Sequence, residues 1–548
     1  MTRPPWPLLV VLSLVLAGTG IRIAAALRPG LWVDEIFSLA MATGHSLEHP
    51  ASEANPSLGD FVEPRQAQSP SVFRRYVQHE EAPVGVGRVV RAVLLSDTSP
   101  PLYYLLLNWW TRTFGTGDAA LRLFSVWWAV LALPLLWLLG REFGRRRVAW
   151  SACLLFSLSP IAIYYSAEGR MYSLVWFLAL GLGWLTLGVA RRRSAPWLAV
   201  LWVLFGAAGL LSHYFFAFVW VACLAWLCVR RRPDRRWRPA VLAGATVLAV
   251  LPWYLDVPAS VMRWRVTGGW LTGDLAWPQA LSRPFALAAS LLSGGKALGL
   301  PGWNWADRFV AGLCLALAIW IARQGLMRRM FSRRRLLLWG WVAAACVGPL
   351  VFDLVLHTKT TDFPRYALAG LPAAMLLVAL GMSHLPPKIR FAFLSALLLA
   401  WLPGSPAILS RAPRPSEAYR EVGARLESRA RPDDVVLVQS TPPGVIGVAR
   451  YLRRDIPLAS WVAALQGRRV PADLQLLLGA RSRVALVKIH DVGGTVRAEP
   501  WLLAHTRLLG REVFHSSPRV QVLYFGPSDG DTFFPERSPP VSGSAAGP

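Results

Sequence analysis

Long apolar runs alternate with short polar segments over the first 404 residues of the chain. The run at residues 7–27 is long enough to cross the roughly 30 Å hydrocarbon core of a bilayer, although small residues follow it and a cleaved signal peptide is the alternative. Ten later runs are similarly apolar, at residues 119–140, 148–166, 171–190, 196–212, 214–229, 239–256, 303–322, 336–356, 365–383 and 389–404. Together the runs predict an α-helical polytopic membrane protein with about eleven transmembrane helices.

Two further apolar segments are expected to lie at the membrane surface instead of crossing the membrane. The segment at 100–114 (PPLYYLLLNWWTRTF) is short for a span, and the segment at 278–300 is interrupted by charged residues, glycine and proline. Counting either one as a span would move the arginine clusters that follow it to the other side of the membrane. We therefore predict interfacial helices at both places.

The arginine clusters between the spans predict the orientation. A net charge of +27 would suit a nucleic-acid-binding protein, but these arginines are grouped in short loops, as in the cytoplasmic loops of membrane proteins. The clusters are at residues 145–147, 191–193, 230–238, 328–335 and 388–390. They predict a cytoplasmic N-terminus, an outer C-terminus and no nucleic-acid partner. Arginine outnumbers lysine. Alanine, glycine and proline are abundant, and this bias is common in bacteria with GC-rich genomes, so a bacterial inner (plasma) membrane is the expected location.

After residue 412 the composition becomes that of a soluble domain. Ser416 is placed to cap a helix that runs to residue 429, and helical stretches are expected near 473–478 and 500–509. Buried strands are predicted at 433–438, 483–488 and 520–525. The chain is thus divided into a membrane domain at 1–410, which includes a long outer loop at 28–118, a small periplasmic α/β domain at 411–527 and a disordered tail at 528–548.

Asp34 and Glu35 follow the first span, in LWVDEIFSLA at residues 31–40. A carboxylate just outside a span can take a proton from an acceptor hydroxyl as that hydroxyl attacks a sugar. The alternative is structural: Asp34 would cap a helix that starts at Ile36, and Glu35 would interact favourably with the helix dipole. The local sequence leaves both interpretations open.

Several other polar side chains are expected on the same face. Arg170 and Tyr172 lie at the outer turn between two spans, and a guanidinium group binds phosphate oxygens through two parallel hydrogen bonds. An ion pair with Glu168 is the alternative for Arg170. Arg365 and Tyr366 occupy a similar position in DFPRYAL at residues 362–368.

A histidine lies between two outer helix ends. His213 occurs in LLSHYFF, and it is either a ligand-binding side chain or a hydrogen-bonded loop residue. The five cysteines lie inside apolar segments without the spacing of a metal site, so no metal ligands are assigned.

The order of these segments resembles the bacterial glycosyltransferase family 39. The acidic pair is followed by DTSPPLYYLLL at 97–107, LRLFS at 121–125, YYSAEGRMYSL at 164–174, then HYF and PRY. That family includes protein O-mannosyltransferases and the lipid A aminoarabinose transferase of the membrane-embedded GT-C superfamily. The resemblance implies a bundle of spans with interfacial helices in the first outer loop, a periplasmic domain, and a polyprenyl phosphate sugar as donor.

The resemblance also implies roles for single residues. Asp34 looks like the family's catalytic base, and Glu35 resembles its companion. Asp97 lies where related enzymes have a second acid before a proline pair, and Arg122 occupies the family's arginine position after the short helix. Many relatives have His or Lys where this chain has Ser99, which removes one positive partner of the donor phosphate, so Arg170 and Arg365 are expected to contribute more. A divalent metal is left open.

The leading functional hypothesis is an inverting glycosyl transfer in which the lipid phosphate leaves as a sugar joins an acceptor hydroxyl. The expected partners are a polyprenyl phosphate sugar donor, a protein, lipid or polysaccharide acceptor, and the bilayer. A lipid or polymer transporter (flippase) is the alternative, for which charges inside the membrane and an inverted repeat are expected. A catalytically inactive scaffold that binds envelope polymers is a third hypothesis.

Overall fold

The structure is a computed structural model of the whole chain. It describes every residue except those at 1–5, 98, 192–194, 231–236, 264, 267–268, 295–303, 411–417, 432–433, 463–464, 466–467, 480–482, 490–496, 515, 517–518 and 528–548. Ser416 and the predicted disordered tail at 528–548 lie outside the described residues. The two proposed domain boundaries, at 410/411 and 527/528, adjoin such residues and stay predictions.

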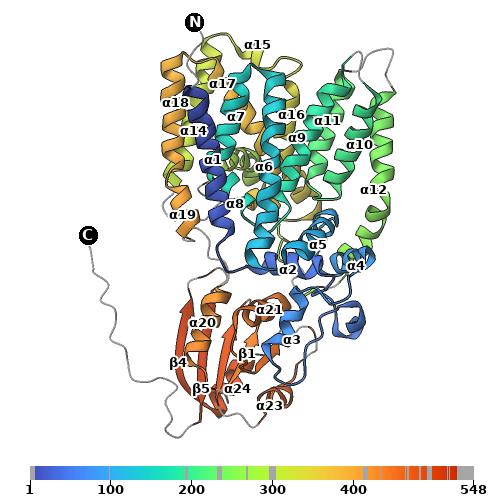
Figure 1. Cartoon of the computed structure of the whole chain (residues 1–548), viewed down its shortest axis with the longest axis vertical. Helices are drawn as coiled ribbons and strands as arrows, with labels where there is room; N and C mark the ends of the chain where they lie inside the picture. Colours follow the sequence, from blue (N-terminus) through green and yellow to red (C-terminus); the bar gives the residue numbers. More distant parts are fainter. Residues whose placement is uncertain are drawn as a thin grey trace, which may run out of the picture.

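A bundle of helices forms the larger part of the molecule, and a smaller sheet domain lies at one end of it (Figure 1). The helices of the bundle are α1 (Trp6–Ala26), α6 (Asp118–Phe143), α7 (Arg146–Leu158), α8 (Pro160–Ser166), α9 (Tyr172–Val189), α10 (Pro196–Leu210), α11 (Phe216–Val229), α12 (Arg238–Met262), α13 (Trp277–Ser293), α14 (Asn304–Arg323), α15 (Met327–Met330), α16 (Leu336–Leu356), α17 (Leu371–Ser383), α18 (Pro387–Trp401) and α19 (Gly404–Ser410). The polytopic helical fold predicted from the apolar runs is confirmed, because each predicted span contains a helix.

Not all of these helices are long enough to span a membrane unaided. Within the described residues, six helices have the length and hydropathy of a span: α1, α6, α9, α12, α14 and α16. The run at 148–166 is two helices, α7 and α8, bent by 64°. The bend falls at Ser159, which is extended at φ −62° and ψ 124° because a residue before proline avoids the helical conformation. Counting this pair as one span gives seven, and α10, α11, α17 and α18 are shorter.

Helix α9 lies at the centre of the bundle, almost wholly buried between α6, α10 and α11. Small residues allow the helices to approach closely, as is usual in membrane bundles. A Cβ atom on Gly140 of α6 would lie 2.8 Å from the Cα of Ala149 on α7. Any larger side chain at residue 140 would therefore force α6 and α7 apart.

The loop at 28–118 forms a layer between the bundle and the sheet domain (Figure 1). Its helices are α2 (Val33–Ala42), α3 (Pro70–Arg74), α4 (Val86–Ser96) and α5 (Leu102–Phe114). With 13 residues, α5 is about 20 Å long, which is shorter than the hydrocarbon core. Helix α13 packs against α14, α16 and α17 and is likewise not among the six helices of span length. The interfacial placement of both helices stays a prediction.

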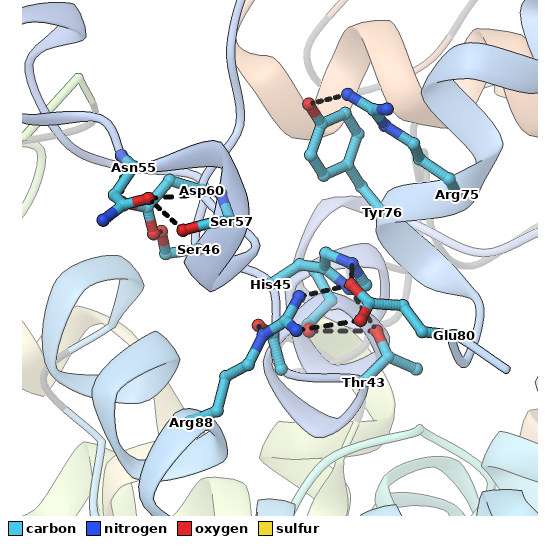
Figure 2. Close-up of polar contacts among 12 residues, drawn as sticks. Thr43, His45, Ser46, Asn55, Ser57, Asp60, Arg75, Tyr76, Glu80 and Arg88 are labelled. Carbon is cyan, nitrogen blue, oxygen red and sulfur yellow. Dashed lines mark hydrogen bonds and ion pairs between the residues drawn. The ribbon is translucent and has the colours of Figure 1, made fainter. Parts of the chain in front are cut away.

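Polar contacts give the 28–118 loop a fixed shape (Figure 2). The guanidinium group of Arg88 faces the carboxylate of Glu80, with an Nη1 to Oε2 distance of 2.8 Å, and its Nε donates to the carbonyl of Gly44. Asp60 accepts a hydrogen bond from Ser46 at 2.6 Å. Its Oδ2 also accepts from Nη2 of Arg91 at 2.7 Å. These contacts join parts of the loop that lie far apart in the sequence.

The C-terminal part is a small α/β domain, as predicted. Its helices are α20 (Tyr419–Arg429), α21 (Pro442–Tyr451), α23 (Ala472–Leu478) and α24 (Ala498–His505). Its strands are β1 (Val435–Gln439), β2 (Leu458–Trp461), β3 (Val484–Lys488), β4 (Arg507–Phe514) and β5 (Val520–Gly526). They form one sheet in the order β2-β1-β3-β5-β4, in which β1 is parallel to β2 and β3, and β5 is antiparallel to β3 and β4.

Three of these five strands match the strands predicted from the sequence, and two were missed. The missed strand β2 has only four residues, too few for an alternating pattern. The missed strand β4 forms the edge of the sheet and contains a glycine and charged residues that face solvent. The helix expected at 500–509 ends earlier, at His505, because β4 begins two residues later.

The sheet domain is fixed to the 28–118 loop. Gln68 and Leu458 exchange two backbone hydrogen bonds of 2.9 and 2.8 Å, which adds the loop to the edge strand β2. Glu63 is buried and forms an ion pair of 3.1 Å with Arg468. The start of α1 and helix α15 lie at the opposite end of the bundle from the sheet domain (Figure 1). This arrangement separates the arginine-rich turn around α15 from the acidic pair of the 28–118 loop.

Candidate active site

The acidic pair lies in the first turn of α2. The helix starts at Val33, with extended Trp32 before it at φ −111° and ψ 175°. The suggestion that Asp34 caps a helix starting at Ile36 is therefore wrong, because Asp34 is already inside the helix. The carboxylate of Glu35 instead accepts a hydrogen bond of 3.3 Å from the backbone N–H of Trp32. Two carboxylates in the first turn are favourable at the positive end of the helix dipole.

Glu35 is fully buried and paired with Arg122 on α6. Two nitrogens of Arg122 donate to the two oxygens of Glu35 at 2.7 and 2.6 Å, and the backbone N–H of Gly169 donates to Glu35 at 2.9 Å. Arg122 also donates to the carbonyls of Arg28 and Gly30 at 2.7 Å each. With its nitrogens engaged in this way, Arg122 holds the start of α2 in place. A role of Arg122 in binding the donor phosphate or the acceptor stays a prediction.

Asp34 is paired with Arg365, 331 residues away in the sequence. The distance from Nη1 of Arg365 to Oδ2 of Asp34 is 3.2 Å, and the Asp34 side chain is 23% exposed. The guanidinium carbon of Arg365 lies 5.1 Å from the ring centres of Trp270 and Phe363 and 5.3 Å from that of Tyr366. Such cation–π contacts orient the guanidinium plane while leaving its edge for an anion.

Arg170 approaches Asp34 from the turn between α8 and α9. Its Nη1 lies 3.4 Å from the backbone carbonyl of Asp34 and 3.3 Å from the hydroxyls of Ser38 and Tyr104. Its Nη2 forms an ion pair of 3.4 Å with Asp97. The structure thus gives Arg170 an acidic partner other than the Glu168 considered from the sequence. These contacts are all long, so the guanidinium group is held loosely by several acceptors.

Asp97 follows the C-terminus of α4 and is held by the residue that departs from the family pattern. Ser99 donates to Asp97 through its backbone N–H at 3.2 Å and through its hydroxyl at 2.9 Å. Burial alone would raise the pKa of the Asp97 carboxyl. The charge of Arg170 and the hydrogen bonds from Ser99 outweigh burial and hold that pKa below its usual range.

His213 lies between two tyrosines of the site. Its ring centre is 6.2 Å from that of Tyr172 and 6.4 Å from that of Tyr366. Its Nδ1 accepts a hydrogen bond of 3.2 Å from the backbone N–H of Phe215. Burial, together with the charge of Arg170, lowers the pKa of His213 to about 3. His213 is therefore neutral at pH 7 and supplies a polar aromatic wall, not a positive charge.

All nine residues selected from the sequence thus lie at the end of the bundle that faces the sheet domain. Asp34, Arg170, Arg365 and Asp97 form a connected polar cluster, with Tyr172, His213 and Tyr366 beside it and the pair of Glu35 and Arg122 behind α2.

The family model of dolichyl-phosphate-mannose-protein mannosyltransferases matches residues 98–255. Nearly the whole chain is similar to a crystal structure of ArnT from Cupriavidus metallidurans bound to undecaprenyl phosphate, with a TM-score of 0.57 over 95% of this chain and 98% of that one, at 13% identity. The chain has the GT-C glycosyltransferase fold. The resemblance inferred from the sequence is confirmed at the level of the fold.

Other matches to the GT-C fold are weaker. The oligosaccharyltransferase AglB from Archaeoglobus fulgidus, in complex with an inhibitory peptide and a dolichol-phosphate, has a TM-score of 0.44 over 87% of this chain and 69% of that one, at 12% identity. No curated protein sequence matches the chain significantly.

Two supports of the candidate site were missed in the sequence. Asp353 at the end of α16 accepts hydrogen bonds of 2.6 to 2.9 Å from Thr358, Thr360 and Thr361, and so shapes the turn that leads to Arg365. The run of threonines after an aspartate was the available signal.

The second support comes from the sheet domain. The hydroxyl of Tyr451 on α21 donates to Asp118 at 2.7 Å and accepts from the backbone N–H of Leu31, also at 2.7 Å. Asp118 in turn accepts from the N–H of Gly30 at 2.6 Å. Gly30 has a φ of 107°, where glycine is favoured over other residues, so the chain turns sharply there into α2. No local pattern could reveal these contacts across 333 residues.

The described part of the chain contains no group of three or more His, Cys, Asp or Glu side chains arranged to hold a metal ion. The acids of the site pair with arginines, which take the place that a cation would have beside them.

Proposed function

We propose that this multi-pass membrane protein transfers a sugar from a polyprenyl phosphate donor to an acceptor hydroxyl, with Asp34 as the general base. One observation carries the proposal: Arg365 pairs with the carboxylate of Asp34, and Arg170, from a separate turn of the bundle, contacts the backbone carbonyl of the same residue. An acid with two arginines around it fits a reaction in which a phosphate leaves and a hydroxyl loses its proton.

Arg365 and Arg170 bind the donor phosphate in this proposal. A guanidinium group offers parallel N–H donors to phosphate oxygens and neutralises the charge that grows on the leaving group. Support comes from the similar ArnT structure, which is bound to undecaprenyl phosphate. Tyr172, His213 and Tyr366 form the wall against which the sugar packs, because aromatic and neutral polar groups suit a carbohydrate.

Asp34 acts once the donor is bound. The donor phosphate competes with Asp34 for Nη1 of Arg365, which leaves an oxygen of Asp34 open to the acceptor hydroxyl. The acceptor oxygen then forms a bond to the anomeric carbon, the bond from that carbon to the phosphate oxygen breaks, and Asp34 takes the hydroxyl proton. Polyprenyl phosphate leaves with the bonding electrons, and the configuration at the anomeric carbon is inverted.

The remaining polar residues hold these groups in place. Asp97 orients Arg170 through their 3.4 Å ion pair, and the buried pair of Glu35 and Arg122 fixes the turn that carries Asp34. The acceptor is a hydroxyl of a protein, lipid or polysaccharide, and the site faces the periplasm of a bacterial inner membrane. The site's charges gather at one end of the bundle, whereas a transporter is expected to bind its substrate near the middle of the membrane.

The test is the turnover of purified Asp34→Asn protein with polyprenyl phosphate sugars. Asn keeps the size of Asp and most of its hydrogen-bonding capacity, so a structural role predicts near-normal activity. Loss of a general base lowers the rate by about 10² to 10⁴, with donor binding nearly unchanged. Release of polyprenyl phosphate by Asp34→Asn at the wild-type rate, from protein of wild-type thermal stability, would refute the role of Asp34.

A further inference from the structure

A second polar site lies where the sheet domain meets the bundle. It is a cleft of about 480 Å³ between the start of α6, helix α3 and the helices α20 and α21. Among the described residues, four arginines line it, Arg74, Arg420, Arg450 and Arg453, together with one carboxylate, Asp118. None of the residues assigned above to the donor site lines this cleft.

The carboxylate of the cleft is already paired. Nη2 of Arg450 donates to Asp118 at 2.8 Å and to the carbonyl of Thr116 at 2.7 Å, and Asp118 also accepts from Tyr451. By contrast, the guanidinium groups of Arg74, Arg420 and Arg453 have no ion pair and no hydrogen bond to any residue that the structure describes. Among the described residues, these three positive charges line one hollow without a carboxylate bound to them, and clustered like charges cost free energy unless an anion joins them.

The position of the cleft limits what can reach it. Pro29, which follows the end of α1 by three residues, and the first residue of α6 both line the cleft. Since α1 and α6 are candidate spans, the cleft lies at the level where their apolar stretches end, which is the level of lipid headgroups. Two of its lining residues, Arg420 and Arg453, are exposed on the surface of the sheet domain, so a soluble molecule can reach them as well.

We propose that this cleft binds a phosphate group, held by the guanidinium groups of Arg74, Arg420 and Arg453. The phosphate belongs either to an anionic lipid headgroup or to a soluble phosphorylated molecule, since both present the same oxygens to arginine. Binding bridges α3 of the 28–118 loop to α20 and α21 of the sheet domain. It therefore strengthens the junction at which Tyr451 and Asp118 hold the residues that lead into α2.

The test compares two triple variants of the full-length protein. The cleft variant is Arg74→Gln, Arg420→Gln and Arg453→Gln, which leaves Arg450 in its pair with Asp118. The control variant, Arg469→Gln, Arg507→Gln and Arg519→Gln, removes three exposed arginines from the sheet domain and so changes the net charge equally. Elution as a single species and wild-type helicity are checked for both.

Two measurements distinguish the sources of the phosphate. Calorimetric titration with pyrophosphate in an uncharged detergent tests the soluble source, and native mass spectrometry of phosphatidylglycerol retained from mixed nanodiscs tests the lipid source. Wild type and control are expected to bind alike, and the cleft variant at least tenfold more weakly. If the cleft variant binds more weakly in just one of the two measurements, the proposal is supported and that measurement identifies the source of the phosphate. Equal binding by the cleft and control variants in both measurements would overturn the proposal and leave the donor site untouched, because no donor-site residue is changed.

Discussion

The donor-phosphate role of Arg365 can be tested by Arg365→Ala. Arg365 is held over three aromatic rings, and its contact with an acid is the 3.2 Å pair with Asp34. Its side chain is only 14% exposed, so an anion bound to it is largely shielded from water. Removal of the guanidinium group therefore removes a charge-assisted contact with the phosphate.

The size of the effect follows from those contacts. A hydrogen bond to a charged group contributes about 1.5 to 3 kcal/mol, which corresponds to roughly 10- to 150-fold in affinity. In the free protein Arg365 already contacts Asp34, and this contact must break when the phosphate binds. We therefore expect the lower part of the range, with the Kd for the donor raised about tenfold. The donor Kd of Arg365→Lys should lie between those of the wild type and Arg365→Ala, because an ammonium group keeps the charge but lacks the planar, two-pronged donor arrangement of guanidinium.

The assay is donor binding and turnover by purified protein, with Arg191→Ala as the control. Arg191 follows α9 at the end opposite to Tyr172, about 27 Å away along the helix, and pairs with Glu142 at 2.6 Å. Its side chain is 56% exposed, so its loss should leave the donor Kd unchanged. Arg192, its neighbour in the same cluster, lies outside the described residues. Equal effects of Arg365→Ala and Arg191→Ala would refute the assignment.

Three further predictions concern the layer around the site. Gly117→Cys, in a background without the five native cysteines, should react with an impermeant thiol reagent from the side of the sheet domain; labelling only from the other side would show that α5 crosses the membrane. Glu35→Gln should lower the thermal unfolding temperature sharply, since breaking a buried ion pair costs about 3 to 5 kcal/mol, and wild-type stability would contradict the buried pair. Because the folded pKa of Asp97 is lowered, its stabilisation is present above the ordinary pKa of about 3.9 and is lost as pH falls below it. The difference in unfolding temperature between wild type and Asp97→Asn should therefore shrink from pH 6 to pH 3, and a constant difference would contradict the ion pair.

The sequence by itself determined the class of fold and the end of the bundle at which the site lies. Apolar runs specify helices because a membrane requires every backbone polar group to be bonded within its own segment. Asp34, Arg170 and Arg365 could be selected because they stand at turns where neither burial nor cytoplasmic retention explains a charge. These properties are local, so a single stretch of sequence carries them.

Only the tertiary structure decided which of these charges meet. Asp34 pairs with Arg365, whereas the adjacent Glu35 pairs with Arg122. Which acid meets which arginine depends on how α2 is rotated against α6. The start of α2 at Val33 likewise depends on Glu35 and on contacts from α6 and α21. No capping residue in the sequence predicts a helix start at that position. The arginine cleft unites Arg74 with Arg420, which lie in different domains. Side chains so distant in the sequence are brought together by the packing of whole elements, and local hydropathy carries no information about that packing.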